Sequence, residues 1–260
     1  MSRVRLDTLL AERGLAPSRS AAATSIRAGK VRLGRGGARA AKPSQLVAAD
    51  SEVQVEAGPR FVSRGGLKLE AALDELDVPV AGRSCLDVGS STGGFTDCLL
   101  QRGAERVLAL DVGRGQLDWS LRNDPRVTVL EGVNARHLSP GELPVAADLA
   151  VIDVSFISLA KVLGPVAGTM APEAEILAMV KPQFELGPGR VGKGGVVRAL
   201  EDRRAAVAGV IEAAGREQLG LVGAAPAGVP GPKGNQEVFI RLRRGEATTG
   251  AEAAIAEAVR

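Results

Sequence analysis

Aromatic and metal-binding side chains are scarce in this sequence. Among 260 residues there is no tyrosine, one tryptophan, five phenylalanines, one histidine and two cysteines. Two cysteines exclude a disulfide framework, and with one histidine they fall short of the about four ligands of a structural zinc site. The core must therefore be built from Val, Leu, Ile and Ala. We expect Cys85 and Cys98 to be buried, reduced thiols.

Long apolar segments are also missing. Met1 is followed by charged residues rather than by the apolar stretch of a signal peptide. No run of about 18 apolar residues is present, so the pattern favours neither a membrane span nor a secreted protein. We expect a cytoplasmic protein.

Basic charge is concentrated at the start of the chain. Residues 1–60 contain eleven Lys and Arg and five Asp and Glu, a net charge of +6, whereas the remaining residues have a net charge of −3. A small basic segment on a mildly acidic body favours a polyanionic partner such as RNA. A basic face that is merely solvated is the alternative.

Residues 1–59 predict a small α+β domain. An amphipathic pattern over 5–14 ends at Gly14, and Ser18 can cap a helix over 19–28 that ends at Gly29. Alternating segments at 30–33 and 51–56 predict strands. The residues from which we expect contacts to RNA phosphates in this domain are Arg3, Arg5, Arg19, Arg27 and Lys30.

The same segment resembles an S4 RNA-binding domain. The resemblance rests on Arg5-Leu6-Asp7, Ser18-Arg19 and Gly29-Lys30-Val31, followed by Lys42-Pro43-Ser44 and Asp50. It implies an RNA-binding domain over residues 1–59, a linker over 60–63 and a second domain over 64–260.

Residues 64–260 alternate between strand and helix patterns. We expect strands at 84–88, 106–112, 127–131, 149–154, 175–180, 220–225 and 237–242. We expect helices at 67–76, 96–102, 117–123, 159–170 and 201–214, and a short helical tail over 243–260. This alternation predicts an α/β fold with a doubly wound, Rossmann-like sheet, and the last strands predict an antiparallel edge.

A glycine-rich turn follows the first strand of this domain. Its spacing, Gly89-x-x-x-Gly93-Gly94 after Asp87, is neither the Gly-x-Gly-x-x-Gly of dinucleotide sites nor a lysine-containing P-loop. An acid followed by such a loop is typical of class I S-adenosylmethionine-dependent methyltransferases. Asp111 can accept the ribose hydroxyls of the adenosyl group, although each such residue alone is also an ordinary turn glycine or strand-end acid. The residues we predict to bind the cofactor are Asp87, Gly89, Ser91, Thr92, Gly93, Gly94, Phe95, Asp111, Val112 and Asn134.

Four further polar residues lie at the ends of predicted elements: Lys68, Asp153, Lys181 and Glu237. Asp153 and Lys181 each follow an apolar strand, where open α/β sheets gather their ligands. A strand-end Asp is about equally often structural. A lysine between an apolar strand and Pro182 is harder to explain by solvation.

This quartet resembles the Lys-Asp-Lys-Glu tetrad of FtsJ-like ribose 2′-O-methyltransferases. Together with the S4 segment, the motifs Ser63-Arg64-Gly65-Gly66-Leu67-Lys68-Leu69 and Asp153-Val154-Ser155-Phe156 make the chain similar to the TlyA (haemolysin A-type) rRNA methyltransferases. The resemblance implies methylation of a cytidine 2′-hydroxyl in 16S and 23S rRNA within ribosomal subunits, from S-adenosylmethionine and without a metal.

The chemistry gives these residues roles. The sulfonium methyl group is already activated, so the enzyme must mainly align it with the 2′-oxygen. A lysine that is desolvated beside another cation can lose its proton and act as a general base, which we assign to Lys181 beside Lys68. Asp153 and Glu237 would then orient the lysines and the ribose.

Three residues of the second domain are further candidates for RNA contacts: Arg64, Phe156 and Lys193. Phe156 can stack on a base lifted out of a helix, or be a core side chain. Lys193 lies in a glycine-rich loop that can close over RNA, or simply be solvated.

Two other functions compete with this interpretation. One is a non-catalytic RNA-binding factor for ribosome assembly, against which the complete tetrad argues. The other is a membrane-active haemolysin, suggested only by the family's name and disfavoured by the lack of apolar segments.

Overall fold

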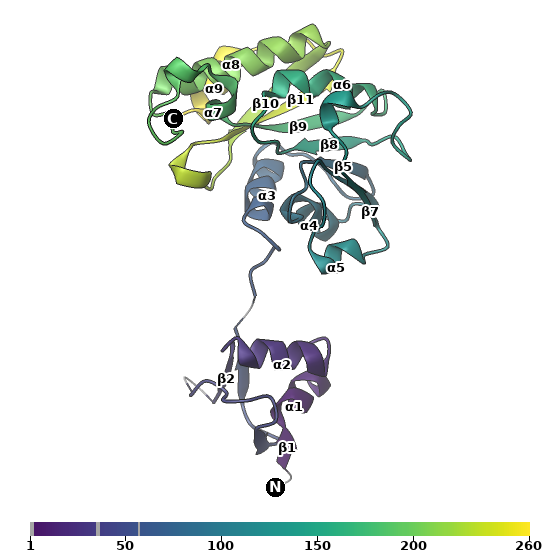
Figure 1. Ribbon diagram of the computed structural model, residues 1–260, viewed down its shortest axis with the longest axis vertical. Helices are drawn as coiled ribbons and strands as arrows, with labels where there is room; N and C mark the ends of the chain where they lie inside the picture. Colours follow the sequence, from purple (N-terminus) through teal and green to yellow (C-terminus); the bar gives the residue numbers. More distant parts are fainter. Residues whose placement is uncertain (1–2, 35–36, 57) are drawn as a thin grey trace. The chain divides into compact units, whose positions relative to one another are not determined.

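The computed structural model describes residues 3–34, 37–56 and 58–260. The chain divides into two compact units, Met1–Arg60 and Phe61–Arg260 (Figure 1). Each unit has a hydrophobic core of its own.

The first unit is built from two short helices and two pairs of strands. Its elements are β1 (Arg3–Arg5), α1 (Leu6–Glu12), α2 (Arg19–Arg27), β2 (Val31–Leu33), β3 (Leu46–Ala48) and β4 (Val53–Val55). β1 pairs with β3 and β2 pairs with β4, both antiparallel. Ser18 caps α2 as predicted, because its Oγ accepts a hydrogen bond from the Ala21 N–H at 3.2 Å. The strands β2 and β4 were predicted, whereas β1 and β3 were not.

The second unit contains a seven-stranded sheet. Its strands are β5 (Ser84–Val88), β6 (Arg106–Asp111), β7 (Val127–Glu131), β8 (Leu149–Ile152), β9 (Glu175–Val180), β10 (Leu219–Pro226) and β11 (Val238–Arg244). They lie in the order β10-β11-β9-β8-β5-β6-β7. The strands β9, β8, β5, β6 and β7 are parallel to one another. β11 is antiparallel to β9, and β10 is antiparallel to β11. The predicted α/β fold and its antiparallel edge are confirmed.

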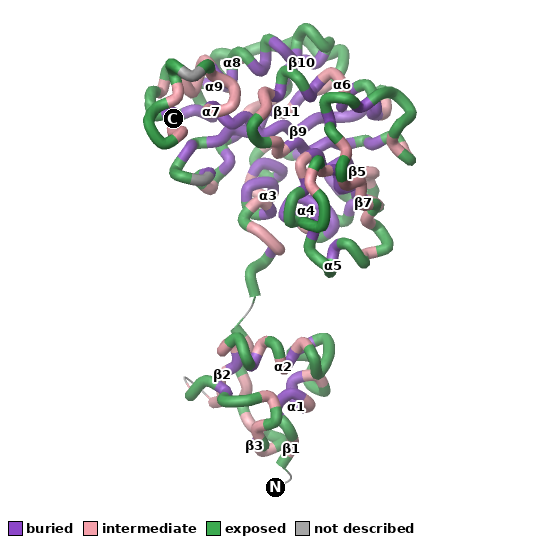
Figure 2. Tube along the Cα trace, in the orientation of Figure 1, coloured by how far each residue is buried: buried purple, intermediate pink, exposed green. Residues whose placement is uncertain are grey.

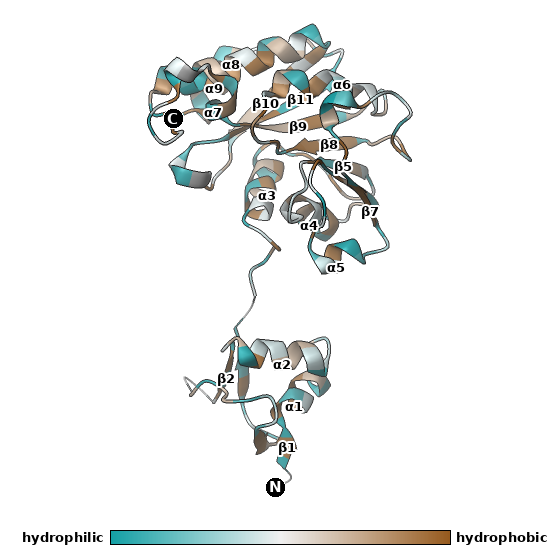
Figure 3. Cartoon of the chain, viewed as in Figure 1, coloured by the Kyte–Doolittle hydropathy of each residue, from teal (hydrophilic) through white to brown (hydrophobic). Residues whose placement is uncertain are grey.

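Helices cover both faces of this sheet. α3 (Gly65–Glu75), α4 (Gly94–Gln101) and α5 (Trp119–Arg122) pack on one face. α6 (Leu163–Gly168), α8 (Leu200–Arg216) and α9 (Ala251–Ala258) pack on the other (Figure 1). The hydrophobic colour concentrates along β8 and β9 (Figure 3), and β9 is buried along its whole length (Figure 2). Both cysteines are buried as expected, and burial raises the pKa of the Cys85 thiol to about 12.

Three predicted helices differ from the structure. The helix expected over 159–170 is split into a 3₁₀ turn, Leu159–Lys161, and α6, because Pro165 has no N–H to donate to the preceding turn. The helix over 117–123 shrinks to α5, since Asp118 caps it by accepting the Ser120 N–H at 2.8 Å. The first residues of the helical tail expected over 243–260 belong to β11, and within that tail only α9 is helical.

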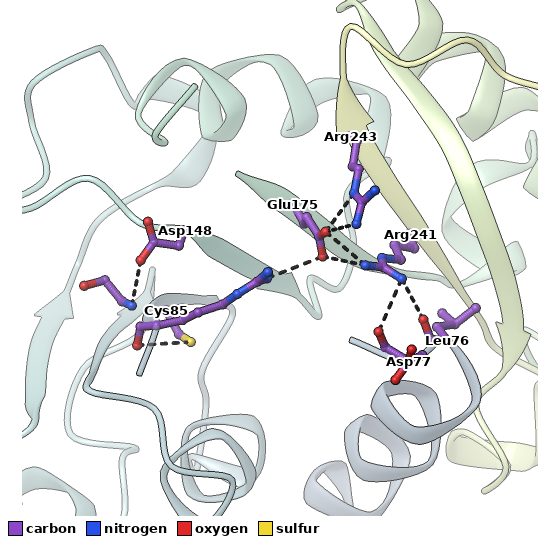
Figure 4. A network of polar contacts seen from close by, with 9 residues as sticks. Leu76, Asp77, Cys85, Asp148, Glu175, Arg241 and Arg243 are labelled. Carbon is purple, nitrogen blue, oxygen red and sulfur yellow. Dashed lines mark hydrogen bonds and ion pairs between the residues drawn. The ribbon is translucent and has the colours of Figure 1, made fainter. Parts of the chain in front are cut away.

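A buried network of charges lies at the amino end of β9 (Figure 4). Glu175 accepts two hydrogen bonds from Arg241, at 2.9 and 3.0 Å, and also pairs with Arg243 and Arg83. Arg241 donates as well to the Leu76 carbonyl at 2.7 Å, at the end of α3. The network therefore joins α3, β9 and β11 at the edge of the sheet away from the carboxyl ends of its parallel strands.

Candidate active site

The four predicted catalytic residues meet at the carboxyl edge of the parallel strands. Asp153 follows β8 and Lys181 follows β9. Glu237 reaches the same edge from the opposite direction, because β11 is antiparallel to β9 and Val238 pairs with Val180. Lys68 comes from the first turn of α3. The sheet order changes direction between β5 and β8, where open α/β sheets form a binding crevice.

Two lysine–carboxylate pairs form the centre of this site. Lys68 Nζ lies 2.5 Å from Glu237 Oε2. Lys181 Nζ pairs with Asp153 and donates to the Ser155 hydroxyl at 2.9 Å. All four line one cavity of about 360 Å³, and both lysines are only 8% exposed. Two cations thus face two anions, which compensates for the cost of removing these charges from water.

Two glycines permit the close approach of these groups. A Cβ on Gly231 would lie 2.2 Å from Glu237 Oε1, and one on Gly89 would lie 2.5 Å from the Asp153 carbonyl oxygen. Gly89 also has a φ of +86°, which side chains with a Cβ rarely adopt. Sequence reasoning found Gly89 through its motif but missed Gly231, which lies in the loop between β10 and β11.

A second cavity of about 400 Å³ adjoins the first. The two share Gly89, Ser91 and Asp153 in their linings. Asp111 lines the second cavity and accepts the Ser91 N–H at 2.8 Å and the Gly113 N–H at 2.7 Å. The shared wall makes the two cavities neighbours, as a transfer reaction between two ligands requires.

The predicted cofactor residues fall into three groups. Those lining the second cavity are Gly89, Ser91, Asp111, Val112 and Asn134, and those lining the first are Gly89, Ser91, Thr92, Gly94 and Phe95. Gly93 and Asp87 line neither cavity: Gly93 approaches Leu117 and Leu121, and Asp87 is buried within β5. Sequence reasoning missed Gln116, and it missed the apolar wall residues Val133, Ala135 and Ile157, which carry no motif.

Asp87 joins β5 to the start of α4, on the two sides of the glycine loop. Its Oδ2 accepts the Thr96 hydroxyl at 2.6 Å, at the start of α4. Burial raises the pKa of this carboxyl to about 7, and the nearby Asp153 and Asp111 add to the effect.

Phe156 is placed outside the core. Its side chain is 91% exposed, so the alternative of a core phenylalanine is wrong. Its ring centroid lies 5.1 Å from that of Phe184, and its backbone φ is +64°. Phe156 also lines the second cavity. An exposed ring at the mouth of a cavity is available to a ligand.

Two of the basic candidates of the first unit, Arg5 and Arg19, lie beside a buried acid, Asp7. Arg5 pairs with Asp7 at 2.7 Å, Arg19 lies 3.8 Å from the same carboxylate, and the hydrogen bond from Arg5 lowers the pKa of Asp7. Arg3 and Arg27 are exposed and Lys30 is half-buried. Sequence reasoning missed Asp7 as the residue that orients two arginines.

The two basic candidates of the second unit are exposed. Arg64 lines the first cavity. The loop that carries Lys193 is fastened by Asn235, which donates to the Gly195 carbonyl at 2.8 Å and accepts the Val197 N–H at 3.0 Å. Asn235 is two residues before Glu237, so this loop is joined to the active-site wall.

Comparison with known proteins identifies the family. A model of FtsJ-like methyltransferases matches residues 61–244, and a model of the S4 domain matches residues 4–53. Over 245 residues the chain is 50% identical to the 16S/23S rRNA (cytidine-2′-O)-methyltransferase TlyA of Mycobacterium tuberculosis, a match that covers 93% of this chain and 90% of the relative. The chain belongs to the TlyA family of FtsJ-like methyltransferases.

Other members of the TlyA family extend the comparison. A 23S rRNA (cytidine-2′-O)-methyltransferase TlyA from Campylobacter jejuni is 40% identical over 127 residues, 49% of this chain and 48% of the relative. The solved structure of a protein described as a hemolysin from Streptococcus thermophilus has a TM-score of 0.73 and 35% identity, and the match covers 98% of this chain and 95% of that one. Despite that name, the part of this TlyA-family chain that the structure describes contains no helix long and apolar enough to cross a membrane.

Proposed function

We propose that this protein transfers the methyl group of S-adenosylmethionine to the 2′-hydroxyl of a cytidine in 16S and 23S rRNA, within ribosomal subunits in the cytoplasm. The observation that carries the proposal is the pair of buried lysine–carboxylate contacts in a cavity that shares a wall with a second, cofactor-sized cavity. The activities of the Mycobacterium and Campylobacter relatives, as their names give them, support the choice of substrate.

The second cavity fits S-adenosylmethionine. Its volume lies in the range of small-molecule sites. Asp111 keeps free lone pairs for ribose hydroxyls, since a carboxylate can accept about four hydrogen bonds. When bound, the cofactor supplies an activated methyl group.

Lys181 is the general base of this proposal. An ammonium nitrogen has three N–H positions, of which Asp153 and Ser155 take two. The third is left for the ribose 2′-oxygen, and in the neutral form of Lys181 this position accepts the hydroxyl proton. Lys68, fixed by Glu237, places a second positive charge in the cavity.

The exposed groups serve RNA binding. In the first unit, arginines oriented by Asp7 contact phosphates. In the second unit, Phe156 stacks on the target base, while Arg64 and Lys193 contact the backbone beside it.

Mass mapping of methylated rRNA nucleotides tests the proposal. Purified protein is incubated with labelled cofactor and either small or large subunits that lack the modification. We expect one added methyl group on a cytidine ribose in each subunit, none with Lys181→Ala, and normal transfer with the control Lys161→Ala, which changes an exposed lysine. Methylation of a base would contradict the proposed chemistry. Subunits that stay unmethylated in cells with the protein, but are misassembled in cells without it, would favour an assembly factor.

A further inference from the structure

Two neighbouring segments leave the sheet beside the active site. The first, residues 153–158, follows β8 and contains Asp153, Ser155 and Phe156. We name it the β8 loop. The second is α7 (Pro182–Glu185), which begins directly after Lys181. The relative position of these two segments therefore sets the relative position of Asp153 and Lys181.

Glu185 of α7 is hydrogen-bonded to the C-terminal end of the β8 loop. Glu185 Oε2 accepts a hydrogen bond from the Ser158 hydroxyl at 2.6 Å, and Glu185 Oε1 accepts the Leu159 N–H at 2.9 Å. Phe184 adds the ring contact to Phe156. The hydrogen bonds that Glu185 accepts lie outside the ion pairs of the active site. Burial raises the pKa of Glu185, which the two hydrogen bonds oppose.

The backbone conformation of the β8 loop requires contacts that stabilise it. Phe156 has a φ of +64°, and a residue with a Cβ in this region costs roughly 1 kcal/mol or more. Its side chain is 91% exposed, so burial of the ring in the core does not offset that cost. Contacts at the ends of the loop must stabilise the conformation instead. Lys181 contacts one end, and Glu185 contacts the other.

We infer that Glu185 is a positioning residue for methyl transfer: it fastens the β8 loop to α7, so that Asp153 and Ser155 stay aligned with Lys181 and the Phe156 ring stays at the mouth of the cofactor cavity. The inference rests on the proposed function. Glu185 acts through Ser158 and Leu159, and it touches none of the reacting groups. Loss of its hydrogen bonds lets the loop relax toward an ordinary backbone conformation and misaligns the site.

Single-turnover methyl transfer to ribosomal subunits, with saturating cofactor and RNA, tests this role. Misplacement of a reacting group by about 1 Å costs on the order of 100-fold in rate, so we expect Glu185→Ala to lower the rate by about 10- to 100-fold. Glu185→Gln should stay within about threefold of the wild type, because its amide can accept from Leu159 and donate to Ser158. The matched control is Glu212→Ala, an acid on α8 whose side chain is 75% exposed.

A second readout separates positioning from general destabilisation. Cofactor affinity by calorimetry should fall less than the rate of transfer in Glu185→Ala, since Asp111 and Gly89 of the cofactor cavity lie outside the β8 loop. Exchange of the Leu159 amide hydrogen should accelerate, because its acceptor is removed. Rescue by Glu185→Gln would not be expected if only the charge of this residue mattered.

A double-mutant cycle decides the mechanism. Ser158→Ala removes one partner of Glu185, so the double variant should be no slower than Glu185→Ala alone. Multiplied effects, or a normal rate in Glu185→Ala, would overturn the inference. If Glu185→Ala fails to fold, Ser158→Ala and Glu185→Gln decide in its place. A wild-type protein that transfers no methyl group to either subunit defeats the proposed function itself, whereas an active wild type with an equally active Glu185→Ala defeats only the positioning role.

Discussion

The substitution Asp87→Asn should stabilise the ligand-free protein at alkaline pH. Asp87 lies in β5 and is 0% exposed, and its carboxylate is hydrogen-bonded by Thr96. Burial raises its pKa from 3.8 to about 7. One pKa unit corresponds to about 1.4 kcal/mol, so ionisation of Asp87 lowers the free energy of unfolding by up to about 4 kcal/mol.

The sign of the pH dependence follows from the direction of this shift. Because the pKa of Asp87 is higher in the folded than in the unfolded protein, the folded state holds the proton more tightly. The contribution of Asp87 to the free energy of unfolding therefore falls as pH rises from about 4 to about 7, and is constant above that range. An asparagine carries no charge at any pH, so this contribution disappears in Asp87→Asn.

Urea unfolding at about pH 5 and about pH 8 measures the effect. At the higher pH we expect Asp87→Asn to be more stable than the wild type by about 1 to 3 kcal/mol, less than the full 4 because the buried amide leaves donors unsatisfied. At the lower pH the advantage should shrink to zero or reverse. The control Glu212→Gln, at an exposed site, should follow the wild type. Parallel pH profiles of wild type and Asp87→Asn would refute the reasoning, whereas weaker cofactor binding by Asp87→Asn would agree with the proposed site.

Three further predictions concern the base, the RNA-binding unit and the buried network. Lys181→Arg should bind cofactor but transfer no methyl group in single-turnover assays, since a guanidinium does not deprotonate, and near-normal turnover would exclude general-base catalysis by this residue. Replacing Arg19 and Lys30 together by Ala should reduce the slope of log affinity for rRNA against log salt by about 1.5 to 2, and an unaltered slope would show that this unit contacts something else. Arg241→Met should lower the free energy of unfolding by about 1.5 to 3 kcal/mol in urea titrations, because Glu175 loses two hydrogen bonds from a charged donor but keeps its pairs with Arg243 and Arg83. The control Arg243→Met, whose side chain is 41% exposed, should cost clearly less, and equal losses would contradict this account.

Elements whose signal lies in neighbouring residues could be predicted from the sequence. The strand that contains Asp87 was predicted with the bounds observed for β5, and the same holds for β7 and β9. A hydrogen-bonding side chain before a helix was enough to place the cap at Ser18. The glycine loop and the strand-end acid Asp111 were visible because chemistry near a backbone turn requires particular residue types at close spacing. The four residues of the tetrad were chosen from element ends in the same way.

Which of these residues meet could not be predicted, because it depends on contacts between elements that are far apart in the sequence. Lys68 and Glu237 are 169 positions apart, and their contact depends on the direction of β11, which no local period encodes. The hold of Glu185 on Ser158 and the gathering of Arg5 and Arg19 around Asp7 are likewise contacts between elements. Pro165, by contrast, was visible in the sequence and was still passed over within a longer helix. Periodicity reports which face of an element is buried, but a buried face can pack against several partners. The choice among them is made by the order and direction of strands in the sheet, and hence by the free energy of the whole core.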